Sequence, residues 1–217
     1  MHRIIVLPGT SDVEAKKSHF ICELKTVRNE DEVKEFLEEI RKEHREARHH
    51  CYAFRLGEPG TEYEKYSDDG EPQGTAGKPI LALLQGAGLY DCVAVVTRYF
   101  GGTLLGTGGL VRAYSDSVKE ALSVSGICEL IKGVRVKISS DYQTANRIKY
   151  LAGTMGIFTE KEEYTDICGF YYLIEQTQYD AFISKITEMS SGRIVPERKT
   201  DVLYYLSGSP VVYKEIK

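Results

Sequence analysis

The chain has 217 residues, which is enough for one or two domains with a buried core. It carries 28 lysines and arginines against 32 aspartates and glutamates, a net charge of −4, which excludes an extended basic field; a nucleic-acid partner would have to meet a local patch. The five cysteines are widely spaced and form no CxxC pair, so we expect a reducing, cytoplasmic location without a disulfide framework. No secretory or membrane-spanning segment is expected.

The first 130 residues predict strands alternating with helices. Asn29 followed by Glu32 forms a capping box that begins an amphipathic helix. The segment 66–81 is too rich in Gly, Pro and Asp for regular structure. The expected strands are 3–7, 16–25, 49–57 and 92–97, and the expected helices run from Asn29 to about 44–48, over 80–88, and from Leu110 to just before Gly126.

The remainder predicts a second domain in the order βαββαβ, the ferredoxin-like arrangement. Asp141 and Thr177 are the expected N-caps of its two helices. We therefore expect an α+β chain with domains at 1–130 and 131–207 and a tail at 208–217. The expected strands are 134–139, 157–164, 167–175 and 193–207.

The stretch between Asp91 and Asp116 contains no acidic residue and is the most unusual part of the chain. Its glycines follow a buried strand and precede a helix, so their backbone N–H groups could bind an anion with help from nearby cations. Alternatively, the glycines form a packing turn and the arginines pair with the acidic residues of the segment 66–81, called the acidic loop below. The candidate residues for an anion or nucleic-acid site are Arg98, Tyr99, Gly101, Gly102, Gly106, Gly108, Gly109, Arg112 and Lys78.

The glycine stretch matches neither common nucleotide fingerprint. Thr107 stands where a Walker A loop needs lysine, and Val111 stands where GxGxxG needs its last glycine. A nucleotide triphosphatase is therefore disfavoured.

Three carboxylates in the segment 66–81, those of Asp68, Asp69 and Glu71, could hold Mg²⁺ through oxygen ligands. A solvated turn, or a loop whose acids neutralise Arg98 or Arg112, is the favoured alternative, because Mg²⁺ usually needs a phosphate ligand as well. No cofactor is otherwise expected.

The run His49-His50-Cys51 lies on an expected strand, with His49 and Cys51 on one side and His50 on the other. It could be half of a zinc site or a nucleophile with its base, but no second Cys/His cluster completes it, so packing is favoured. The tyrosine pairs at 171–172 and 204–205 could stack bases, yet one ring of each pair should face inward.

Four motifs together resemble the IMPACT family, the YigZ/YvyE-type bacterial proteins. They are KSHF (17–20), A-x-HHCYAF (47–54), SDDGEPQGTAGKPIL (67–81) and VVTRYFGGTLLGTGGLVRAYS (95–115). The resemblance implies a first domain with the two-layer α/β fold of elongation factor G domain IV and the GHMP kinases, and a second like that factor's last domain. Many members carry a lysine at the position of Leu104, so this chain lacks one cation there.

The resemblance also implies a role in translational control under stress, without established catalysis. Our leading hypothesis is a non-enzymatic regulator that binds RNA or the ribosome through the glycine/arginine loop, and no catalytic residue is assigned. One alternative is an enzyme or sensor that binds a small phosphorylated metabolite with Mg²⁺. Another is a protein-interaction module that meets a protein partner in translation control.

Overall fold

The computed structural model describes residues 2–216 and divides into two compact units, Met1–Glu129 and Leu130–Lys217. Both units are mixed α/β, which confirms the fold class predicted from the sequence. Within the described residues no helix is both long and apolar enough to cross a membrane.

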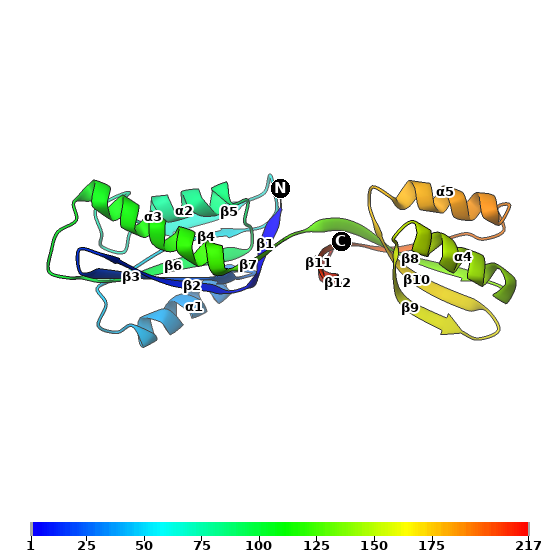
Figure 1. Ribbon diagram of the computed structural model, residues 1–217, viewed down its shortest axis with the longest axis horizontal. Coiled ribbons are helices and arrows are strands. Elements are labelled where there is room, and N and C mark those ends of the chain that lie inside the picture. Colours follow the sequence, from blue (N-terminus) through cyan, green and yellow to red (C-terminus); the bar gives the residue numbers. More distant parts are fainter. Residues whose placement is uncertain (1, 217) are drawn as a thin grey trace. The chain divides into compact units, whose positions relative to one another are not determined.

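Unit 1 is built on an antiparallel sheet whose strand order is β2-β3-β6-β4-β5 (Figure 1). The central strand β6 is buried at every position except Tyr99, because helices cover both faces of the sheet. This double burial explains why its sequence is a continuous apolar run. The strands are β2 (Gly9–Ala15), β3 (Ser18–Thr26), β4 (His49–Leu56), β5 (Tyr63–Ser67) and β6 (Cys92–Tyr99).

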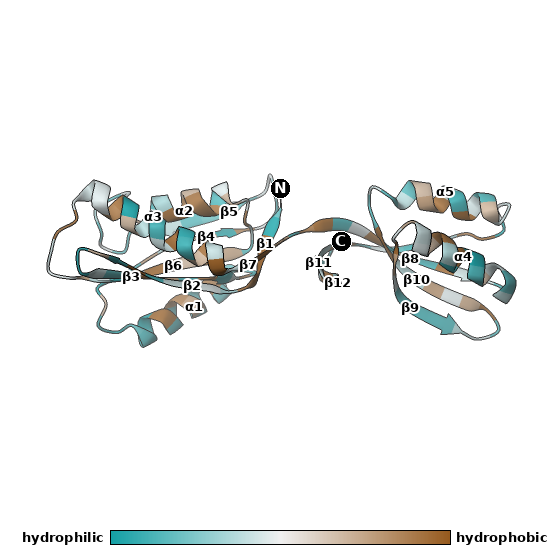
Figure 2. Ribbon diagram, viewed as in Figure 1, coloured by the Kyte–Doolittle hydropathy of each residue, from teal (hydrophilic) through white to brown (hydrophobic). Residues whose placement is uncertain are grey.

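Helices α2 (Gly77–Gly86) and α3 (Thr107–Val124) pack on one face of this sheet, and α1 (Glu30–Glu43) packs on the other (Figure 1). The structure thus adds a third layer to the two that the sequence predicts. The reason is the apolar face of α1, whose residues Val33, Phe36, Leu37 and Ile40 are buried against β4 and β6. Figure 2 shows α1 alternating between brown and teal, as an amphipathic helix should.

A two-stranded antiparallel ribbon joins the two ends of unit 1. Strand β1 (Arg3–Leu7) pairs with β7 (Gly126–Glu129). Strands β2, β5 and β7 are not predicted from the sequence; β2 and β5 are the edge strands of the main sheet. Edge strands are half exposed and carry charged side chains, which weakens their apolar signal.

Unit 2 contains a five-stranded antiparallel sheet with the order β12-β11-β8-β10-β9, and α4 and α5 pack on one face. Without β12 the elements run βαββαβ, as predicted. Asp141 caps α4 by accepting a hydrogen bond from the Thr144 N–H. The elements are β8 (Ile131–Ser140), α4 (Tyr142–Thr154), β9 (Phe158–Tyr164), β10 (Cys168–Glu175), α5 (Tyr179–Met189), β11 (Glu197–Ser207) and β12 (Ser209–Ile216).

Two local expectations for unit 2 are wrong. The segment expected as a tail, 208–217, contains β12, which folds back onto β11 through Gly208 at φ +75°. Thr177 does not cap α5: its hydroxyl bonds to Glu175, and the helix begins after Gln178 without a side-chain cap.

Candidate functional site

The glycine loop between β6 and α3 owes part of its composition to geometry. A Cβ at Gly101 would lie 2.0 Å from the carbonyl of Lys17, so only glycine allows this approach to the β2–β3 turn. The Gly101 N–H also donates to the Ser18 hydroxyl. Gly102 and Gly106 have φ of +82° and +74°, which side chains other than glycine rarely adopt. These three glycines are required by the fold.

Gly108 has no such requirement. It lies exposed in the first turn of α3, has no positive φ, and a Cβ there would meet no heavy atom within 4 Å outside its own helix. Gly109 is more confined, since its Cβ would lie 3.0 Å from that of Leu105. The presence of Gly108 therefore needs an explanation other than packing.

The start of α3 has no capping side chain. The first helical hydrogen bond runs from Leu110 N–H to the Gly106 carbonyl, and Gly106 is the N-cap. The N–H groups of Thr107, Gly108 and Gly109 thus belong to the donors that a helix leaves unsatisfied at its start. The first turn contains no acidic residue. This end of α3 has the backbone donors and the positive dipole end that attract an anion.

Arg98 forms a buried ion pair with Glu71. The Nη1–Oε1 distance is 2.6 Å and both side chains are less than 8 % exposed. The Tyr114 hydroxyl donates to the same carboxylate oxygen at 2.9 Å, and the Cys51 thiol lies 3.3 Å from that hydroxyl. Arg98 therefore pairs with the acidic loop, as one of the two interpretations of the sequence proposed.

Burial keeps the inner members of this network neutral. It raises the pKa of Tyr114 well above its ordinary value, so the phenol remains a donor to Glu71. It likewise raises the pKa of the Cys51 thiol, which also contacts the Asp68 carbonyl. A thiol held protonated is a poor nucleophile. The network is suited to positioning the loops and not to covalent chemistry.

The three acidic-loop carboxylates do not converge on one point. Asp68 accepts the N–H groups of Gly74, Ala76 and Gly77 and thereby starts α2. Asp69 accepts the N–H of His50, while Glu71 faces Arg98. Their oxygens are not among the described groups of three that come within 4.8 Å of one another. The arrangement gives no support to the Mg²⁺ site considered from the sequence.

The other predicted cations and aromatics lie apart from Arg98. Arg112 is exposed, donates a hydrogen bond from its Nε to the Gly108 carbonyl at 3.3 Å, and lines a separate hollow beside Glu14 and Asp116. Lys78 is exposed in the first turn of α2. The Tyr99 hydroxyl bonds to His44 Nδ1 at 2.9 Å at the end of α1. Arg98 and Arg112 therefore do not form the joint clamp that the sequence suggests.

A cavity of about 460 Å³ lies where three of the sequence motifs meet. It is bounded by the start of β4, the acidic loop and the glycine loop with the start of α3. Its polar wall includes Arg98, whose Nε is buried and has no hydrogen-bond partner among residues 2–216. Phe100 and Leu104 are exposed at 47 % and 82 %. The lining residues are Arg48, His49, Glu71, Pro72, Arg98, Phe100, Leu104, Leu105, Gly106, Thr107 and Leu110.

The alternation expected for β4 is present. The His49 ring contacts the Asp69 carbonyl, and Cys51 lies on the α2/α3 side among the core residues. His50 contacts the Thr97 hydroxyl, and its burial lowers the pKa of the imidazole. In unit 2, Tyr172 and Tyr204 are buried while Tyr171 and Tyr205 are half-buried.

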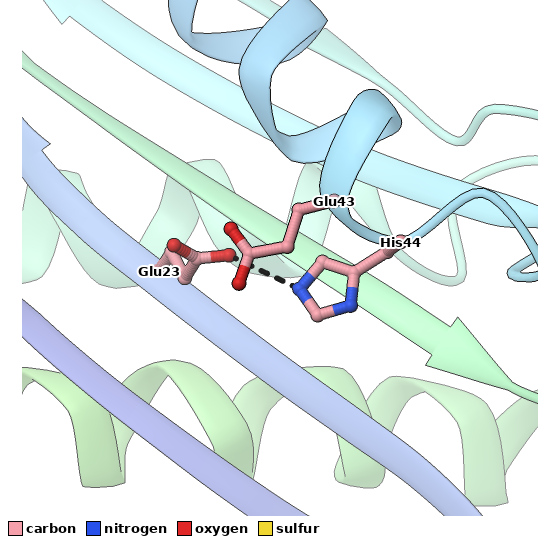
Figure 3. A group of neighbouring side chains, drawn as sticks. All are labelled: Glu23, Glu43 and His44. Carbon is pink, nitrogen blue, oxygen red and sulfur yellow. Dashed lines mark ion pairs between the residues drawn. The ribbon is translucent and has the colours of Figure 1, made fainter.

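A second cluster lies on the α1 side of the sheet, where Glu23, Glu43 and His44 bring potential ligand atoms within 4.8 Å of one another (Figure 3). His44 Nε2 is 3.5 Å from Glu23 Oε1. Burial, and then the charge of Glu43, raise the pKa of Glu23, against the lowering effect of His44. Sequence reasoning missed this cluster because 20 residues separate Glu23 from the end of α1.

The fold and the cavity describe a two-unit α/β protein whose most distinctive surface is an uncapped helix start beside a small hollow. The Impact N-terminal domain family matches residues 16–122, and a domain of unknown function (DUF1949) matches 138–193. The chain is 38 % identical over 185 residues to the IMPACT family member YvyE of Bacillus subtilis, covering 85 % of each protein. The chain therefore belongs to the IMPACT family, as predicted.

Two further proteins are similar to this chain. The IMPACT family member YigZ of Escherichia coli is 52 % identical over 116 residues, which is 53 % of this chain and 57 % of YigZ. A crystal structure described only as that of a hypothetical protein is 34 % identical, with a TM-score of 0.56, covering 90 % of this chain and 95 % of the other.

Proposed function

We propose that this protein is a non-enzymatic regulator of translation that binds RNA, on the ribosome, through the start of α3. The observation that carries the proposal is the uncapped first turn of α3, where Gly108 leaves the backbone N–H groups open to a phosphate. The family resemblance, in which both domains are likened to domains of elongation factor G, supports the ribosome as the place of binding.

The electrostatic part of this binding should be modest. Arg98 is committed to Glu71, and Arg112 lies beside two acidic residues in another hollow. Arg48, exposed at the cavity, is the cation left at this site. With one or two phosphates contacted, the logarithm of the binding constant should fall with the logarithm of salt concentration with a slope of about −1, at roughly −0.7 per phosphate of a single strand.

Ribosome co-sedimentation at low and moderate salt tests the proposal, comparing Gly108→Glu with Gly108→Ala. Glutamate in the first turn favours the helix through its dipole, yet it repels phosphate. We expect wild type and Gly108→Ala to pellet at low salt and Gly108→Glu to remain in the supernatant. Gly153→Glu, at an exposed and equally open position of α4, is the matched control and should pellet.

Two outcomes would refute the proposal. One is that no form of the protein pellets at any salt concentration. The other is that Gly108→Glu pellets as well as wild type. Binding that survives nuclease digestion of the RNA would instead favour a protein partner in translation control.

A further inference from the structure

We infer that the cavity beside the start of α3 binds one nucleoside monophosphate unit, with its phosphate at the helix start and its base against Phe100. This inference rests on the proposed function, because it names the ligand of the same site. The same chemistry could come from a free mononucleotide or from the 5′-phosphorylated end of an RNA, and the experiment below separates these sources.

The cavity wall contains a buried cation that is only partly satisfied. Arg98 is 6 % exposed and lines the cavity, and its Nε has no hydrogen-bond partner within the described residues. Leaving a buried charged donor unpaired is unfavourable, so native proteins usually provide it with a partner. Glu71 occupies Nη1, and Nε is closed to solvent, so a ligand in the cavity would meet the part of the guanidinium that lines the wall. This observation is independent of the uncapped start of α3.

The size and polarity of the cavity fit a mononucleotide. A volume of about 460 Å³ is within the range of small-molecule sites and fits one nucleotide, not a folded RNA segment. The helix start, with Gly106 and Thr107 in the wall, supplies donors. Phe100 and Leu104 in the same wall supply exposed apolar surface, and the Arg98 guanidinium lies 5.4 Å from the centroid of the Phe100 ring. A ligand with one anionic group and one flat apolar body matches this lining, and aromatic rings commonly stack on bases.

The charge of the cavity wall limits the charge of the ligand. The cations in the wall are Arg48 and Arg98, and Glu71 neutralises the second of them. Thr107 occupies the place where a triphosphate-binding loop has its lysine. A monophosphate therefore matches the wall better than a triphosphate.

Isothermal titration calorimetry of the full chain with AMP, UMP, ATP, adenosine and inorganic phosphate tests the inference. We expect AMP and UMP to bind at least tenfold more tightly than inorganic phosphate, adenosine or ATP. Phe100→Ala removes a half-exposed ring and should weaken AMP at least tenfold, whereas Tyr150→Ala, which removes a 76 % exposed ring in unit 2, should change nothing. A six-nucleotide RNA with a 5′-phosphate should bind at least tenfold more tightly than its 5′-hydroxyl form if RNA ends are the source.

The result that overturns the inference is the absence of mononucleotide binding at millimolar concentration together with equal binding of the two RNA forms. If ribosome pelleting still depends on Gly108 in that case, the proposed function stands and the cavity inference alone fails. If AMP binds and no ribosome pellets, the inference stands for a free nucleotide and the proposed function fails.

Discussion

The start of α3 in unit 1 and the start of α4 in unit 2 differ in whether a side chain accepts a hydrogen bond from the first N–H groups of the helix. Both helices pack on one face of an antiparallel sheet. At α4, Asp141 accepts the Thr144 N–H, and this bond lowers the pKa of the carboxyl group. At α3, Gly106 offers no side chain and the first turn has no acid. Helix α4 thus has a side-chain acceptor for one of its first N–H groups, whereas none of the described side chains caps the start of α3.

The comparison depends on what holds the start of α3 in place. The buried cluster of Arg98, Glu71, Tyr114 and Cys51 connects β6, the acidic loop, α3 and β4. No comparable buried ion pair is found in the described part of unit 2, where the pairs are at least partly exposed. Unit 1 thus combines an uncapped helix start with a buried polar cluster that connects this helix to the neighbouring strands and loop.

Removing that support should have the largest effect. Glu71→Gln leaves the guanidinium of Arg98 buried without its counter-charge, and we expect the free energy of unfolding of unit 1 to fall by about 3–5 kcal/mol. Denaturant unfolding followed by hydrogen exchange in α3 and α4 would measure the two units separately. The control Asp116→Asn breaks an exposed pair with Lys119 and should change stability little. If Glu71→Gln lowers the free energy of unfolding no more than Asp116→Asn does, the buried ion pair does not stabilise unit 1.

The next effect tests whether packing requires the glycine at position 101. Gly101→Ala forces a Cβ against the backbone of Lys17, so we expect a loss of about 1–3 kcal/mol in the stability of unit 1. A thermal melt read by near-ultraviolet circular dichroism would measure it. If Gly101→Ala is as stable as wild type, the loop can shift, and its glycines are not fixed by packing.

A smaller pair of changes tests the two helix starts against each other. Gly108→Ala should stabilise α3 by about 0.5–1 kcal/mol, because alanine loses less backbone entropy on folding and meets no neighbour. Asp141→Ala should destabilise α4, because a cap is lost. Local hydrogen exchange should therefore slow in α3 and accelerate in α4. Changes of the same sign would remove the distinction between the capped and the open helix.

The smallest effect concerns Glu23 on the far face of the unit 1 sheet. Burial raises the folded-state pKa of this carboxyl group, so the folded protein binds its proton more tightly than the unfolded chain. Stability should therefore fall as pH rises from the ordinary carboxyl pKa through the raised value. Glu23→Gln removes this penalty, so its melting temperature should exceed that of wild type at neutral pH, with the difference vanishing near pH 4. A difference independent of pH would exclude this explanation.

Much of the fold follows from local signals. The continuous apolar run of β6 and the caps Asn29 and Asp141 are readable because each depends on neighbouring residues. Strands β2 and β5 are short, polar edge strands and give no such signal. Thr177 has the right residue type for a cap, yet its hydroxyl finds Glu175 instead.

The site was predictable only in part. The sequence identifies the glycine loop as unusual, because its composition is local. It offers pairing of Arg98 with the acidic residues of the 66–81 segment as one alternative, but it does not single out Glu71, 27 residues away, or show that Arg112 lines another hollow. Nor does it separate Gly101 from Gly108, since the close approach to Gly101 comes from Lys17 in the β2–β3 turn, which is distant in the sequence. Both distinctions depend on contacts between distant segments.

Backbone amide NMR during titration with a short single-stranded RNA tests the central claim most directly. If the open start of α3 binds phosphate, the amide resonances of Thr107, Gly108 and Gly109 should shift most in wild type, and these shifts should be lost in Gly108→Glu. The amides at the start of α4, where Asp141 already serves as cap, should not move. Unchanged α3 amides, with shifts elsewhere on the protein, would contradict the account.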